Sequence, residues 1–252
     1  MILDEFNHFI KSIKLRSDKI PSTSVYPFSL PAVQYLSELK FHPNVTFIVG
    51  ENGSGKSTIL EAIATSYGFN PEGGTRNFNF ASFDSHSLLH DYVTVAKGAI
   101  RPNDGFFLRA ESFYNVASYI EELDRKFGGA KLINQYGGVS LHDQSHGESF
   151  MSLFLHKFRA NGMYILDEPE AALSPSRQMT MIARLHELVM QGCQFIIATH
   201  SPILMAYPNA TIYEIKDGYH KVTYKETEHY QITKAFLDYP DRMLRVLMEQ
   251  NE

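Results

Sequence analysis

Apolar residues occur along the chain in short runs that alternate with stretches of helical spacing. The runs at 10–16 and 45–49 (VTFIV) predict β-strands, because they are short and rich in branched and aromatic side chains. The second run leads directly into a glycine-rich segment and then into the helical stretch STILEAIATSY. The pattern therefore predicts a strand, a loop and a helix in direct succession.

The second half of the chain alternates between the two kinds of element. A helix from about residue 147 precedes the strand MYILD, and a helix from about residue 175 precedes the strands QFIIAT and TIYEI. Alternation of this kind predicts a parallel sheet wrapped by helices. The last part of the chain, about 229–250, predicts one or two short helices.

The middle of the chain carries a different pattern. YVTVAKGAI and GFFLRA flank the turn-like RPNDG and predict a hairpin, within an insertion of β character over about 68–110. From Phe113 the apolar residues follow helical spacing until Gly128 and Gly129. These residues predict the start of a helical subdomain over about 112–161.

Composition indicates one folded domain, residues 1–252. A hydrophobic fraction of 44% and a charged fraction of 20% are typical of a globular protein and exclude a disordered or fibrous chain. Internal repeats and heptads are absent from the sequence. The net charge of -5 gives no overall attraction to polyanions. One basic stretch could contact nucleic acid, but acidic residues flank it, so this support is weak: Lys11, Lys14, Arg16 and Lys19.

The single cysteine, Cys193, cannot form an internal disulfide and is typical of a reducing compartment. The segment MILDEFNHFI has acidic residues where a secretory signal needs positive charge, and no apolar run approaches the length of a membrane span. We therefore expect a cytoplasmic protein without a membrane segment of its own.

The clearest chemical motif is the segment Gly50–Ser57, which fits G-x-x-x-x-G-K-[ST]. In this pattern backbone N–H groups surround phosphate oxygens, the lysine neutralises their charge and the serine hydroxyl binds Mg²⁺. The helix that follows would point its N-terminal dipole at the phosphates. The residues predicted to bind nucleotide are Gly50, Glu51, Asn52, Gly53, Ser54, Gly55, Lys56, Ser57 and Thr58.

Three further motifs lie at the ends of predicted elements. The strand MYILD ends in Asp167 and Glu168, whose side chains point to opposite faces and can do different work. Ser145-His146-Gly147-Glu148-Ser149 opens a helix and can present hydroxyl and N–H groups to an anion. His200 follows the strand QFIIAT. Each motif alone is also typical of an ordinary cap, a surface acid or a structural histidine.

Together these motifs resemble the ABC-type ATPases in kind and in order. Walker A corresponds to Gly50–Ser57, the signature to SHGES at 145–149, Walker B to the strand ending in Asp167 and Glu168, the D-loop to the region of Ala172-Leu173-Ser174, and the switch histidine to His200. The resemblance spans about residues 10–215. It implies an α/β P-loop NTPase fold with a mostly parallel central sheet, an N-terminal antiparallel β portion and a helical subdomain.

The resemblance also implies roles for these residues. Lys56 and the loop amides would hold the phosphates of ATP, Ser57 and Asp167 the Mg²⁺ ion, and Glu168 the attacking water. His200 would sense the γ-phosphate. The signature residues Ser145, His146, Gly147 and Glu148 would complete the site of a second copy, so a homodimer on ATP binding is implied.

The sequence departs from the family at two positions. Glu111 stands where the family places a glutamine, and we expect it to be a further candidate for Mg²⁺ or water. The signature reads Ser-His-Gly-Glu-Ser, although its serine and the following glycine are retained. GENGSGKST and the order Asp-Glu-Pro-Glu look more like the branch that contains SMC and recombination ATPases, without their coiled-coil insertion. Tyr26 and Tyr35 are candidates for stacking on adenine.

Several alternatives stay open. We expect an ATPase that dimerises on binding ATP and acts on an unidentified partner protein; the same motifs fit the nucleotide-binding subunit of a membrane transporter, or a nucleotide sensor or scaffold that does not hydrolyse. The choice between ATP and GTP has no sequence signal of its own. His86 and His90, like His142 and His146, have a spacing that zinc ligands use on a helix, but without nearby cysteines we do not expect zinc.

Overall fold

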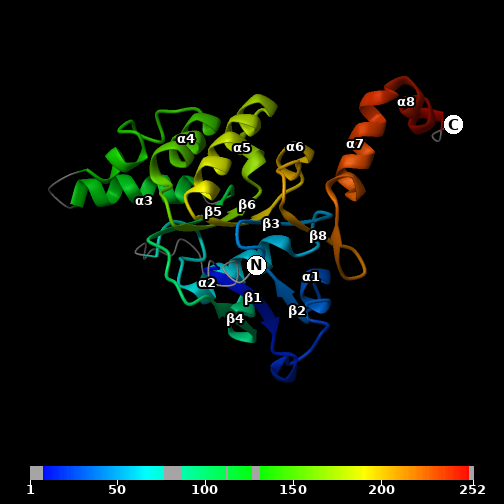
Figure 1. The fold of residues 1–252 in the computed structure, drawn as a ribbon, viewed down its shortest axis with the longest axis horizontal. Coiled ribbons are helices and arrows are strands. Elements are labelled where there is room, and N and C mark those ends of the chain that lie inside the picture. Colours follow the sequence, from blue (N-terminus) through cyan, green and yellow to red (C-terminus); the bar gives the residue numbers. More distant parts are fainter. Residues whose placement is uncertain (1–7, 77–86, 112, 127–130, 250–252) are drawn as a thin grey trace.

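A six-stranded sheet forms the centre of the molecule and separates two layers of structure (Figure 1). The computed structural model describes residues 8–76, 87–111, 113–126 and 131–249. In the order β5-β6-β7-β3-β8-β9, the strands pair in parallel except for β9, which is antiparallel to β8. Their bounds are β3 Val45–Gly50, β5 Asp104–Arg109, β6 Gly162–Asp167, β7 Gln194–Ala198, β8 Thr211–Ile215 and β9 Tyr219–Val222. The prediction of a mostly parallel central sheet is confirmed.

The inner strands are apolar on both faces because both faces are covered. Every residue of β3, β6 and β7 is buried. Successive side chains point to opposite faces, so Phe47 and Ile197 pack into one hydrophobic core while Ile48 and Ile196 pack into the other. The continuous apolar runs in the sequence are therefore the mark of strands between two layers.

A smaller antiparallel sheet lies in the layer below, with the strand order β2-β1-β4. It consists of β1 Ile10–Leu15, β2 Glu38–Lys40 and β4 Val93–Lys97. This sheet confirms the predicted N-terminal antiparallel portion. It packs against the same core as α2 (Lys56–Tyr67), next to the short helix α1 (Pro31–Gln34).

The hairpin predicted around RPNDG is wrong. β4 pairs with β1 in the small sheet, whereas β5 pairs in parallel with β6 at the edge of the central sheet. The burial pattern gives the reason. Four consecutive residues of β5 are buried, as a parallel strand covered on both faces requires, whereas β4 is mostly exposed. The range 68–110, expected to be an insertion, therefore supplies one strand to each sheet.

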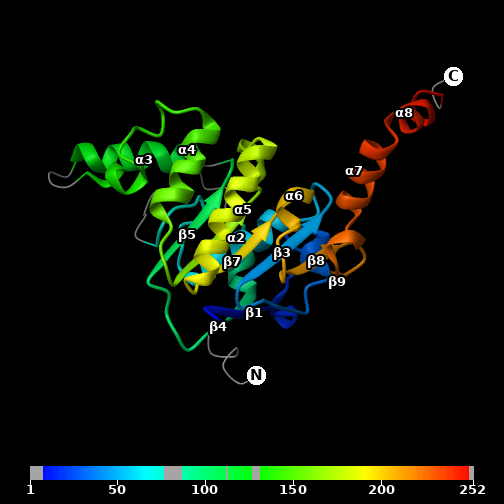
Figure 2. The ribbon, with the colours of Figure 1, turned by 45° about the horizontal axis from the view of Figure 1, so that its top comes forward.

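The opposite face of the central sheet is covered by helices α3 to α6 (Figures 1 and 2). Their bounds are α3 Phe113–Lys126, α4 His146–Ser152, α5 Pro175–Met190 and α6 Pro202–Met205. A π-helical turn, η5 (Leu153–Lys157), continues α4. The predicted end of the first of these helices, Gly128 and Gly129, lies outside the described residues. The remaining short elements are 3₁₀ helices: η2 Ser17–Lys19, η3 Leu88–Tyr92, η4 Leu132–Tyr136, η6 Pro169–Ala172 and η7 Tyr224–Glu226.

The last two helices, α7 (Glu228–Asp238) and α8 (Pro240–Glu249), extend away from the sheet beside β8 and β9 (Figure 2). Along α7, all of which is described, no residue is buried. Large apolar side chains stand exposed along the pair, among them Ile232, Leu237, Tyr239, Val246, Leu247 and Met248. Within the described ranges, no helix combines the length and the apolar character needed to cross a membrane.

Candidate nucleotide site

The glycine-rich loop connects β3 directly to α2 and wraps around the lysine at its end. Gly55 has a φ of 98° and a Cβ there would come within 3.0 Å of the Leu30 Cβ, so both conformation and space favour glycine. The Lys56 Nζ donates to the carbonyl oxygens of Gly50 at 3.0 Å and Glu51 at 2.9 Å. The ammonium group is therefore held inside the loop, where a phosphate would need it.

The electrostatics of Lys56 fit an anion site. Burial lowers the pKa of this lysine, while the nearby carboxylates of Glu168, Asp167 and Glu170 act in the opposite direction. Only 4% of the residue is exposed. The carboxylates help to keep the buried Lys56 ammonium charged, and a buried ammonium group binds phosphate oxygens strongly.

The strand β6 delivers Asp167 to the same place. The Ser57 hydroxyl donates to the Asp167 Oδ1 at 3.0 Å, so the two predicted Mg²⁺ ligands are in contact. Burial raises the pKa of Asp167 to about 7, although the Arg109 guanidinium, whose Nε lies 3.8 Å from Oδ2, and the Ser57 hydroxyl both lower it. Burial makes the charged form of Asp167 unfavourable, so a bound cation beside it would stabilise the carboxylate.

These two oxygen donors suit Mg²⁺, which prefers hydroxyl, carboxylate and phosphate oxygens. The orphaned Ser54 Oγ and Arg109 Nε atoms are buried without hydrogen-bond partners and mark the surroundings as a polar site. Ser57 and Asp167 would hold the ion, which would neutralise phosphate charge. Glu111 is 89% exposed and lies 3.6 Å from the Arg109 Nη2, so its role as a ligand stays a prediction.

Glu168 leaves the line of β6 in an unusual conformation. Its φ of 50° and ψ of 53° are left-handed, which is uncommon for a residue other than glycine and recurs at functional sites. The Glu168 Oε1 lies 3.2 Å from the His200 Nε2. The structure therefore brings together the two residues predicted from the ends of neighbouring strands β6 and β7.

The signature residues form the start of α4. The Ser145 hydroxyl and N–H both donate to the Glu148 carboxylate, at 2.6 and 3.0 Å, in a capping box. The Arg177 Nη2 on α5 lies 3.4 Å from the other Glu148 oxygen. Ser145, His146 and Glu148 are exposed, whereas Gly147 is buried so closely that a Cβ would meet the Ala172 carbonyl oxygen at 2.7 Å. The Ser145–Glu148 bonds therefore lie within one helix turn that faces solvent, and Arg177 connects that turn to α5.

Three side chains that the sequence did not single out belong to this site. Glu170 accepts hydrogen bonds from the Thr199 hydroxyl at 2.8 Å and from the His200 N–H, so it fixes the loop that carries His200. Arg109 joins Asp167 to a buried acid of α2, Glu61. His229 on α7 lies beside His200. The order Asp-Glu-Pro-Glu was a sequence signal for Glu170. His229 had no such signal, because α7 comes close to the site only in the folded chain.

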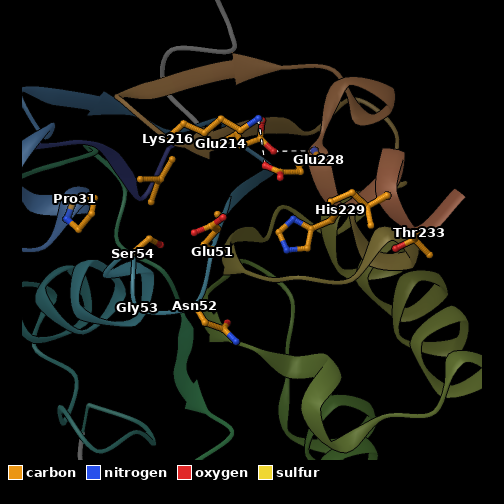
Figure 3. A pocket seen from close by; sticks show the side chains of 13 residues that line it. Pro31, Glu51, Asn52, Gly53, Ser54, Glu214, Lys216, Glu228, His229 and Thr233 are labelled. Carbon is orange, nitrogen blue, oxygen red and sulfur yellow. Dashed lines mark hydrogen bonds and ion pairs between the residues drawn. The ribbon is translucent and has the colours of Figure 1, made fainter. Parts of the chain in front are cut away.

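A cavity of about 620 Å³ lies beside the loop, between β8 and the start of α7 (Figure 3). Its walls include the loop residues Glu51 and Asn52 on one side and His229 on the other. Tyr26 and Tyr35, the adenine-stacking candidates, do not line this cavity, and both are exposed. Their role stays a prediction.

The pair His142 and His146 does not share one helix, as the zinc spacing would require. His142 precedes α4 rather than lying on it, and its Nε2 contacts the Ser118 hydroxyl. His86 lies outside the described residues. Within the described part of the chain, no group of three or more His, Cys, Asp or Glu could hold a metal ion.

Comparisons with known proteins agree with this geometry. A family model described as an AAA domain matches residues 33–103, and another described as an AAA ATPase domain matches residues 108–205. A solved structure of an ABC transporter in an inward-facing conformation aligns with a TM-score of 0.50 at 12% identity, covering 89% of this chain and 88% of that one. The fold is that of an ABC-type P-loop ATPase.

The comparisons also found a similar curated protein and a further similar solved structure. The cytochrome c biogenesis ATP-binding export protein CcmA of Legionella pneumophila (strain Paris) is 27% identical over 184 residues, which cover 67% of this chain and 86% of that protein. An SMC head bound to the C-winged helix domain of ScpA is 16% identical, with a TM-score of 0.47 and coverage of 85% of this chain and 98% of that one.

Proposed function

We propose that this ABC-type protein binds ATP with Mg²⁺ and hydrolyses it, and that ATP binding joins two copies in a dimer that acts on a partner protein. One observation supports the chemistry above all. The Ser57–Asp167 and Glu168–His200 contacts lie at the carboxyl ends of the parallel strands, where the loop that holds Lys56 also lies. Positioned charges of this kind supply most of the catalysis in phosphoryl transfer.

The roles follow from the positions. Lys56 and the loop N–H groups bind the phosphates. Glu168 orients the attacking water and takes its proton, while His200, next to it, contacts the γ-phosphate. The exposure of Ser145 and Glu148 supports a role for the signature in a second copy, because a group in solvent is free to change partners.

The proposal is tested with Glu168→Gln, which keeps the shape of the side chain and removes the base. We expect this variant, at saturating ATP and Mg²⁺, to elute as a dimer of twice the 28.7 kDa monomer mass while releasing no phosphate. The measurement is light scattering coupled to size exclusion, with a phosphate-release assay on the wild-type protein. Lys56→Ala is the control and should stay monomeric and inactive. A Glu168→Gln variant that stays monomeric would contradict the dimer, and a wild-type rate no higher than that of Lys56→Ala would contradict hydrolysis.

A second candidate function has an observation of its own. The curated relatives at 24–27% identity carry names of transporter ATP-binding proteins, which favours a nucleotide-binding subunit of a membrane transporter. The order Asp-Glu-Pro-Glu favours the SMC-like branch instead. Co-purification separates the two: a membrane protein retained by the ATP-bound Glu168→Gln dimer would support the transporter, and a water-soluble partner would support the other branch.

A further inference from the structure

His229 connects the C-terminal helix α7 to the reaction site. Its Nε2 lies 2.9 Å from the His200 Nδ1, and the two ring centroids are 5.0 Å apart. The His200 Nε2 in turn lies 3.2 Å from the Glu168 Oε1. Figure 3 shows the His229 ring pointing from α7 into the cavity beside the loop. Three side chains from separate parts of the chain thus form a continuous series that ends at the proposed base.

The chemistry of the series fixes where the hydrogens lie. Burial and the nearby Lys56 ammonium lower the pKa of both histidines, so both rings are neutral near neutral pH. A neutral imidazole carries one N–H donor and one acceptor nitrogen. The Glu168 carboxylate only accepts, and its Oε1 lies 3.2 Å from the His200 Nε2, so its charge favours a hydrogen on that nitrogen although the two atoms lack hydrogen-bond geometry. The His200 Nδ1 is then the acceptor, and it takes the N–H of the His229 Nε2.

The main chain on both sides of this pair is anchored. The Glu228 N–H donates to the Glu214 Oε1 at 2.9 Å, and the Lys216 Nζ lies 3.2 Å from Glu214 and 3.4 Å from Glu228. These bonds fix the first turn of α7 to β8, while Glu170 fixes the backbone of His200. The side chain of His229 then connects the anchored start of α7 to the His200 ring.

We propose that His229 is a positioning residue, which holds His200 in the tautomer that donates from Nε2 and so couples α7 to the hydrolysis step. The inference rests on the proposed function and adds a regulatory connection to the same site. A displacement of α7, for example by a partner on its exposed apolar side chains, would release His200 and slow hydrolysis. Nucleotide binding by the loop would be retained.

Steady-state kinetics of three variants test this role. His229→Ala removes the donor, and we expect kcat to fall about tenfold, a part of what the loss of a general acid or base costs, with KM for ATP within about twofold of wild type. His229→Gln retains an N–H donor near the same position and should recover most of kcat. Gln231→Ala, which changes an exposed residue of the same helix that does not line the cavity, is the matched control and should leave kcat unchanged.

Three kinetic outcomes would overturn the proposal. One is a wild-type kcat in His229→Ala. Another is an equal loss of kcat in His229→Ala and His229→Gln, because the N–H donor retained in His229→Gln would then not be responsible for the effect of His229 on kcat. A rise in KM with unchanged kcat would equally place His229 in binding rather than in positioning.

A measurement without hydrolysis separates this inference from the proposed function. Nitrogen-15 NMR of the nucleotide-free protein reports which ring nitrogen of His200 carries hydrogen, with His200→Gln used to assign the signals. We expect hydrogen on Nε2 in wild type and a mixture of both tautomers in His229→Ala. Hydrogen on Nδ1 in wild type would overturn the inference, even if ATP is hydrolysed. The expected tautomer in a protein that hydrolyses no ATP would support the His229–His200 contact while the proposed function fails.

Discussion

The phosphate-loop half of the candidate site and the signature half differ in how their polar groups are satisfied. In the phosphate-loop half, which comprises residues 50–58, 167, 168 and 200, buried and partly exposed side chains at the start of α2 and at the ends of β6 and β7 make contacts between these elements. In the signature half, residues 145–148, the hydroxyl of Ser145 bonds to Glu148 of the same helix turn, in solvent. The first half is joined by contacts between separate strands and helices, whereas the second is held by bonds within the first turn of α4 and by an exposed contact to Arg177 on α5.

This difference has an energetic meaning. Buried polar groups must keep their partners, because a lost hydrogen bond there costs the full desolvation of the group left behind. An exposed capping box exchanges its bonds with water at little cost. The phosphate-loop half is thus preorganised for a ligand, while the Ser145 hydroxyl is free to exchange Glu148 for another acceptor, as the proposed dimer requires.

Complementation between two variants gives the sharpest test of this division. Glu168→Gln, which is expected to dimerise, and Ser145→Ala should each lower ATP hydrolysis to about one hundredth of wild type or less, as the loss of one positioned catalytic group does. A mixed dimer, however, contains one site with an intact Glu168 and an intact signature. An equal mixture should therefore recover about a quarter of the wild-type rate, since half of the dimers are mixed and each has one intact site. Phosphate release against mixing ratio measures this.

Thr223→Ala is the matched control, because Thr223 and Glu226 form a second exposed capping box at η7. It removes the same kind of cap without touching the signature and should retain the wild-type rate. If the mixture stays at the average of its two components, the shared site is contradicted. A loss in Thr223→Ala equal to that in Ser145→Ala would mean that helix capping, not phosphate contact, accounts for the effect.

The sequence indicated that the residues of the phosphate-loop half lie near one another, because the signals for their positions are local. The spacing from Gly50 to Ser57 encodes a loop by itself, and the apolar strands before Asp167 and His200 place those residues at one edge of a parallel sheet. Arg109 and His229 escaped prediction for the opposite reason. Each acts on a residue far away in the chain, and Arg109 stands on β5, which the local turn signal RPNDG assigned to a hairpin. The turn residues RPNDG favoured a hairpin, but β5 is apolar enough to be buried on both faces and so pairs with β6 instead.

Arg109→Ala tests whether buried charges hold the phosphate-loop half together. The Arg109 Nη1 lies 2.8 Å from the Glu61 Oε2, and only 9% of the Glu61 side chain is exposed. Removing the cation leaves buried carboxylates unpaired, so we expect the free energy of unfolding to fall by about 2 kcal/mol and the melting temperature by about 6 °C. Lys126→Ala, which breaks an exposed pair with Glu122, should leave the melting temperature unchanged. Equal melting temperatures for the two variants in calorimetry would contradict the role of the buried pair.

Asp167→Asn is expected to have the smallest effect, and it tests the electrostatic strain that burial imposes on the phosphate-loop half. Burial raises the pKa of this carboxyl from 3.8 to about 7. A carboxyl with a raised folded-state pKa stabilises the fold fully only below its ordinary pKa, and that contribution is lost as pH rises to about 7. In EDTA at about pH 8 the variant should therefore melt about 4 °C above wild type, with a smaller difference at about pH 5. Melting curves whose separation does not change between these pH values would show that the fold, rather than a bound cation, already compensates the charge of Asp167.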